Sequence, residues 1–126
     1  MKAYHFTEMP YPCLDAVADR DTDYVNIPNR VYDPATGAGL YSRYLDEYAI
    51  ADELGLELML NEHHQTPTCL DAAVPLMAAV LARITKRARI LVLGNPVANR
   101  EDPVRIAEEM AMIDVISRGR LDCGFV

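Results

Sequence analysis

Segments of strand length alternate with helical segments along most of this chain, and this alternation constrains the fold more than any other feature. Apolar, β-branched and aromatic residues predict strands at 2–7, 56–61, 88–97 and 120–126. Helical spacing of apolar residues predicts helices at 40–55, 71–84 and 101–119. Strands that alternate with helices pair in parallel through right-handed crossovers, so the sequence predicts an α/β protein with a parallel sheet.

Two of the helices carry clear boundary signals. The third helix begins with acidic residues and Pro103 and ends at Gly119, the usual asymmetry of helix termini. The second helix contains Pro75, which lacks an N–H and is tolerated only in the first turn. A helix start with a cap near Asp71 follows from that position.

A long segment, residues 8–39, separates the first strand from the first helix. It holds four prolines and shows no sustained period. A loop of this length in a compact domain is usually a lid or binding loop, or else is disordered. The 126 residues otherwise form one predicted domain, because no internal boundary or short repeat interrupts the alternation.

Two α/β architectures compete at this length. A small doubly wound sheet would be complete at this length, whereas a whole (β/α)₈ barrel, which needs about 250 residues, would not fit. The dinucleotide fingerprint G-x-G-x-x-G does not follow the first strand. Half a barrel would leave two open strand edges with unpaired backbone groups. The chain could pair strand to strand with a second copy, adopt an open sheet instead, or be a fragment of a longer protein.

Composition excludes several classes of function. The net charge of -7 argues against a nucleic-acid surface, which requires clustered basic residues. No apolar stretch approaches the roughly 20 residues of a membrane span, and the N-terminus does not resemble a signal peptide. The three cysteines, Cys13, Cys69 and Cys123, predict free thiols and a cytoplasmic location.

Polar residues and glycine stand where three successive predicted strands end. Glu8 follows the first strand, residues 61–64 (Asn-Glu-His-His) follow the second, and Gly94 and Asn95 close the third. Chemistry in parallel α/β proteins belongs at the carboxyl ends of the strands. These residues are therefore the predicted site.

The two adjacent histidines allow three interpretations. They could be loop histidines satisfied by backbone carbonyls, or metal ligands together with His5, or one of them could be a general acid/base oriented by Glu62 or Asn61. Adjacent residues of an extended segment face opposite ways, which disfavours a shared metal ion. No metal site is predicted.

Two stretches resemble a known family. "GLELMLNEHHQT" and "ARILVLGNPVANREDPVRIAEEMAMIDVISRGRLDCGFV" are similar to the bacterial luciferase-like, flavin-dependent monooxygenases, in particular limonene 1,2-monooxygenase-like and alkanal monooxygenase-like members. The resemblance implies the N-terminal half of a (β/α)₈ barrel, reduced FMN from a separate reductase, and O₂. It implies an organic substrate such as an aldehyde or a terpene.

The same resemblance implies roles for individual residues. His63 matches the catalytic acid/base, and the cofactor-binding positions are Glu62, Gly94, Asn95 and Val126. Helices 71–84 and 101–119 would form a homodimer interface, although burial of the strongly apolar second helix within one subunit is an equal interpretation. The alternative functions are a non-catalytic half-barrel assembly module and, less favoured, a metal-dependent hydrolase.

Overall fold

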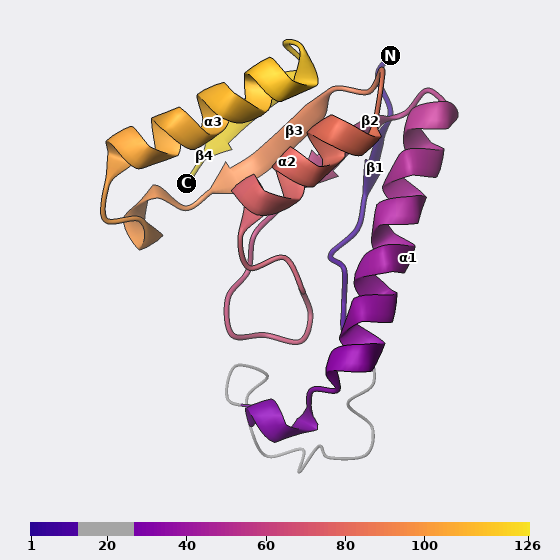
Figure 1. The fold of residues 1–126 in the computed structure, drawn as a ribbon, viewed down its shortest axis with the longest axis vertical. Coiled ribbons are helices and arrows are strands. Elements are labelled where there is room, and N and C mark those ends of the chain that lie inside the picture. Colours follow the sequence, from indigo (N-terminus) through magenta and orange to yellow (C-terminus); the bar gives the residue numbers. More distant parts are fainter. Residues whose placement is uncertain (13–26) are drawn as a thin grey trace.

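The computed structural model describes residues 1–12 and 27–126, in which one parallel sheet carries the fold (Figure 1). Its four strands are β1 (Tyr4–Phe6), β2 (Glu57–Leu60), β3 (Ile90–Asn95) and β4 (Leu121–Phe125). They lie in the order β1-β2-β3-β4, and each neighbouring pair is parallel. A doubly wound sheet reverses its strand order part-way, whereas a barrel wall follows the chain order as here. The half-barrel prediction is confirmed against the doubly wound alternative.

Three helices join these strands, as predicted. They are α1 (Pro34–Glu53), α2 (Val74–Ile84) and α3 (Pro103–Ser117), with short 3₁₀ turns at Asn29–Val31 and Val97–Asn99. Figure 1 shows α2 and α3 side by side over β3 and β4, with α1 lying along the β1 and β2 side. No helix in the described part of the chain is both long and apolar enough to cross a membrane.

The first helix starts earlier than predicted, so the loop assigned to 8–39 is wrong over its last six residues. Asp33 caps the helix, because its carboxylate accepts the N–H of Thr36 at 2.8 Å, and Pro34 takes the first position. Glycines have low helix propensity, so Gly37 and Gly39 argue against a helix here. Gly37 is nevertheless required by packing, because an added Cβ would lie 1.8 Å from the Tyr32 hydroxyl oxygen. Residues 13–26 of the predicted loop, with Cys13, lie outside the described residues.

The second helix begins three residues later than predicted. Asp71 does not cap it directly: its carboxylate accepts the N–H of Ala73 at 3.1 Å, just before the helix starts at Val74. The third helix matches its signals closely, since Asp102 accepts the N–H of Val104 at 2.8 Å. Its end is a left-handed turn, with φ of 80° at Gly119.

The core lies on one face of the sheet. Leu58, Ile90 and Val92 are 0% exposed beneath the helices. Positions that alternate with them belong to the opposite face, where Leu93 is 50% exposed. The helices therefore cover one face, and the other, which would line the inside of a barrel, is open in the part of the chain described.

A buried carboxylate joins the end of α1 to the connection between α2 and β3. Asp52 is 5% exposed and accepts the backbone N–H groups of Lys86, Arg87 and Ala88 at 2.9, 2.9 and 2.6 Å. Burial raises the pKa of Asp52, but the three N–H donors outweigh it and bring the pKa below its ordinary value of 3.8. The Arg120 guanidinium satisfies the neighbouring carbonyl groups, including that of Ala88.

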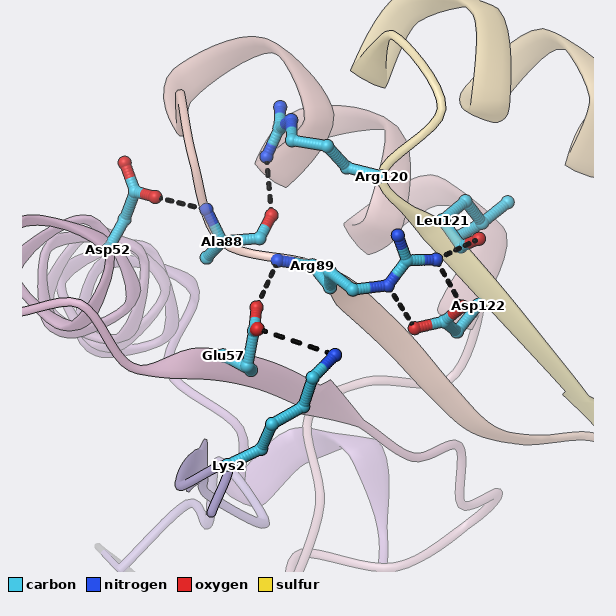
Figure 2. A network of polar contacts seen from close by, with 8 residues as sticks. All are labelled: Lys2, Asp52, Glu57, Ala88, Arg89, Arg120, Leu121 and Asp122. Atoms are coloured by element: carbon cyan, nitrogen blue, oxygen red, sulfur yellow. Dashed lines mark hydrogen bonds and ion pairs between the residues drawn. The ribbon is translucent and has the colours of Figure 1, made fainter.

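An ionic network links the amino ends of all four strands (Figure 2). Lys2 pairs with Glu57, which accepts the N–H of Arg89, and the Arg89 guanidinium pairs with Asp122. These charges satisfy one another across strands and fix the register at this end of the sheet. The opposite end holds the predicted site.

Candidate functional site

The ends of β1 and β2 meet through side chains. The Asn61 amide donates from Nδ2 to Oε2 of Glu8 at 2.7 Å, and Nε2 of His63 lies 3.4 Å from the same oxygen. The His63 side chain is 51% exposed. A half-exposed imidazole beside a carboxylate can both reach a ligand and exchange a proton with it.

Glu62 connects the end of β2 to two other segments. Its side chain is 0% exposed, and its carboxylate accepts from Nε2 of His64 at 2.6 Å, from Nη2 of Arg100 at 2.7 Å and from the N–H of Val74 at 2.8 Å. Burial of Asp71 raises its pKa to about 6, with a further contribution from the Glu62 charge. The Glu62 carboxylate is thus an internal anchor that accepts from the Arg100 guanidinium, the His64 imidazole and one backbone N–H.

The two histidines serve different carboxylates. His63 faces Glu8 and His64 faces Glu62, in agreement with the geometric argument that they do not share one site. One of the two histidines was expected to be oriented by Glu62 or Asn61: Glu62 pairs with His64, whereas the carboxylate beside His63 is Glu8, which Asn61 holds. His5 packs edge-on against the Tyr48 ring at 4.9 Å. Among residues 1–12 and 27–126, no three His, Cys, Asp or Glu side chains gather in a way that could hold a metal ion.

A pocket of about 620 Å³ opens beside His63. Its walls include the Tyr11 and Tyr32 rings, whose centroids lie 5.2 Å apart with a tilt of 40° between the ring planes, together with Pro67 and Leu70. None of the described residues that line it is Asp, Glu, Lys or Arg. Cys69 also lines the pocket, but burial raises the pKa of its thiol, so it remains protonated and does not act as a nucleophile.

The ends of β3 and β4 bring Gly94 and Val126 together. A Cβ on Gly94 would lie 3.0 Å from Cγ1 of Val126, and the Val126 N–H donates to the Asn95 carbonyl oxygen at 3.2 Å. Val126 is 75% exposed, with Leu93 and Phe125 also exposed nearby in sequence. Asn95 as a whole residue is 0% exposed, and neither polar atom of its side-chain amide has a partner among the described residues. Its carbonyl oxygen already accepts the Val126 N–H, so Asn95 presents no accessible group to a cofactor in this conformation.

Sequence comparison places the chain in a family. Residues 25–126 match the profile of the luciferase-like monooxygenases. The chain belongs to the luciferase-like monooxygenase family. It is 38% identical, over 96 residues, to the oxygenase component of a flavin-dependent trigonelline monooxygenase from Acinetobacter baylyi (strain ATCC 33305 / BD413 / ADP1). That alignment covers 75% of this chain and 26% of the relative, so the chain spans about a quarter of that protein's length.

Solved structures of monooxygenases share the fold. Monooxygenase RslO1 from Streptomyces bottropensis superposes with a TM-score of 0.69 and 24% identity over 99% of this chain and 32% of its own. The oxygenating constituent of 3,6-diketocamphane monooxygenase from Pseudomonas putida, a type II Baeyer-Villiger monooxygenase in complex with FMN, gives a TM-score of 0.70 and 16% identity. This superposition covers 100% of this chain and 29% of the Pseudomonas putida protein. The predicted fold, the N-terminal part of a luciferase-like barrel, is confirmed.

Sequence reasoning missed Arg100 and gave Glu8 no partner. The signal for Arg100 was its place between the third strand and the cap of the third helix, at the carboxyl end of the sheet where charges converge. A buried carboxylate on the neighbouring strand end requires such a cation. The sequence marks Glu8 only as a polar residue after the first strand.

Proposed function

We propose that this luciferase-like protein is a flavin-dependent monooxygenase, or the N-terminal part of one, that uses reduced FMN and O₂ to oxygenate a small organic molecule. The observation that carries the proposal is His63: a half-exposed imidazole beside Glu8, in the wall of a pocket at the carboxyl ends of the strands. Family membership supplies the reaction class, and His63 supplies the acid/base that such a reaction needs.

The residues at the ends of β3 and β4 would line the flavin ring. Gly94 lacks a side chain, and the exposed, apolar Val126 side chain lies against it. Gly94 and Val126 would hold the ring, and buried Asn95 would support the end of β3 behind them. The bound flavin would supply the oxygen chemistry.

His63 would move the proton. Because its Nε2 faces the Glu8 carboxylate, Nδ1 is the atom left to give a proton to the substrate or accept one. Glu8 is itself held by the Asn61 amide, which limits the directions in which the imidazole can turn. The aromatic and proline side chains around the pocket would keep water from the reacting atoms.

The pocket favours an uncharged substrate. The described walls combine the Tyr11 and Tyr32 rings and Leu70 with neutral polar groups, and carry no formal charge. An apolar or weakly polar molecule, such as an aldehyde or a terpene, would be desolvated there without leaving a charge unpaired.

The partners of this activity would be a flavin reductase and a second copy of the chain. The curated relative is named as an oxygenase component, which supports a separate source of reduced flavin. A groove of about 650 Å³ lies between α2 and α3, where Leu76 is 70% and Met112 is 62% exposed. Such a surface supports a dimer through these helices. The free thiols of Cys69 and Cys123 fit a reducing cytoplasm.

Substitution of His63 tests the proposed reaction. In the flavin-loaded protein, His63→Ala should lower the oxygenation rate about 10²- to 10⁴-fold, the usual contribution of a general acid/base, and leave the Kd for reduced FMN within about twofold. Thr66→Ala is the matched control, since Thr66 lines the same pocket and has no titratable group. Equal losses of rate and of flavin binding in His63→Ala would assign His63 a structural role.

A non-catalytic assembly module remains the second candidate, because one sheet face is open in the described structure. Its test is direct titration of the folded chain with oxidised and reduced FMN. Self-association without any flavin binding would support the module, and flavin binding would refute it.

A further inference from the structure

Glu62 is buried in a way that leaves it no surface for a ligand. Its side chain is 0% exposed. Oε1 accepts from His64, and Oε2 accepts from both Arg100 and the N–H of Val74. A carboxylate is costly to bury and is retained when charge-assisted donors surround it. All of these donors belong to the protein.

The three donors come from segments that must be held together at the strand ends. His64 lies in the segment between β2 and α2, Val74 is the first residue of α2, and Arg100 lies between β3 and α3. The His63 N–H donates to the Asp71 carbonyl oxygen at 3.1 Å within the first of these segments. Glu62 therefore ties the backbone that carries His63 to the segment that continues from β3.

We propose that Glu62 is a positioning residue that sets His63 relative to the Gly94–Val126 surface through its ion pair with Arg100 and its hydrogen bond with His64, and that it does not contact the cofactor. The inference rests on the proposed function for the meaning of His63. Glu62 fixes the β2 side of the site, and Arg100 follows β3, which carries Gly94, after the short 3₁₀ turn Val97–Asn99. Loss of this tie would let the acid/base and the ring surface move independently, and small misplacements of reacting groups cost large factors in rate.

Amide hydrogen exchange on the folded chain tests whether Glu62 links the segment after β2 to the segment after β3. Glu62→Gln keeps an oxygen for the Val74 N–H but removes the charge, and Arg100→Met removes the other partner. Either substitution should speed exchange about tenfold or more in both segments, at His63 as well as at Arg100, and the double variant should add little to the single ones. Glu101→Gln, an exposed neighbour in sequence, is the matched control and should change nothing.

Two results would refute this link between the two segments. Faster exchange at Val74 alone would reduce Glu62 to the cap of α2, and unchanged exchange in both segments would remove its role. In either case the strand amides of Leu58 and Ile90 report whether the fold is intact.

Kinetics of the flavin-loaded protein test the positioning. Glu62→Gln should lower kcat for oxygenation about tenfold to a hundredfold, with KM for the substrate and Kd for reduced FMN within about twofold. A tenfold rise in the flavin Kd at unchanged kcat would make Glu62 a cofactor contact and refute the inference. Absence of flavin binding in the unsubstituted protein would instead overturn the proposed function, and the exchange experiment separates the two failures.

Discussion

Replacement of Asp52 by asparagine should remove a large share of the stability of this fold. The carboxylate accepts three backbone N–H groups in a site that is 5% exposed. Asparagine keeps one oxygen and turns an NH₂ group toward a backbone donor, so at least one N–H of the 86–88 segment loses its partner. Hydrogen bonds to a charged group contribute about 1.5–3 kcal/mol, and an unpaired buried donor costs about 1–3 kcal/mol. We expect Asp52→Asn to lower the free energy of unfolding by about 3 kcal/mol.

Urea unfolding at neutral pH measures this loss. With a slope of about 1–3 kcal/mol per molar urea, the midpoint should fall by roughly 1–2 M. Asp46→Asn, on the exposed side of the same helix, is the control and should leave the midpoint nearly unchanged.

Acid provides the second arm of the experiment. The pKa of Asp52 is lower in the folded protein, so its stabilisation is present above the ordinary value of 3.8 and is lost as pH falls through the folded value. The difference between the parent and Asp52→Asn should therefore shrink below pH 3.8. A difference that persists unchanged in acid, or a loss no larger than that of Asp46→Asn, would refute the reasoning.

Three further predictions concern stability. Arg120→Lys should cost about 2–3 kcal/mol in urea unfolding, because an ammonium group cannot replace a guanidinium that donates to five oxygens. Gly124→Ala should lower stability by about 1–3 kcal/mol, because its Cβ would lie 2.6 Å from the Val92 carbonyl oxygen. Gly39→Ala should raise stability by about 0.5–1 kcal/mol, because no atom lies within 4 Å of the added Cβ. Thermal unfolding compares the two variants. Asp71→Asn should stabilise the protein at neutral pH by about 1–2 kcal/mol. The pKa of Asp71 is raised from 3.8 to about 6, so the native state loses stability as pH rises from 3.8 to about 6, and the gain from Asp71→Asn should vanish below pH 3.8 in urea unfolding.

The fold was predictable because its signals are local. Apolar runs and helical periods mark each element, and Asp102 with Pro103 marked a helix start that the structure reproduces. The start of α1 was missed because its glycines lower helix propensity, while the reason for Gly37 is a contact with Tyr32 that sequence patterns do not show. Tertiary packing decided that boundary.

The site was predictable only as a location. Strand ends indicated where His63, Glu62 and Gly94 would lie, and the structure places them there. Which carboxylate serves which histidine depends on side-chain directions at two neighbouring strand ends, and Glu8 reaches His63 from β1. The burial of Asn95 likewise follows from the irregular register between Val92 and Asn95, a feature without a local sequence signal.

The pairing register of the sheet also sets an order of assembly. Leu58 pairs with Ile90, and Ile90 pairs with Leu121, so each of these contacts closes about thirty residues of chain. Tyr4 pairs with Glu57 across a span of more than fifty residues that includes the long segment before α1. Because β1 has only three residues, few contacts offset the entropy lost in closing this loop. We therefore expect β2, β3 and β4 with their two helices to form the folding nucleus and β1 to dock afterwards. Glu8, the carboxylate beside His63, would then arrive last, together with β1.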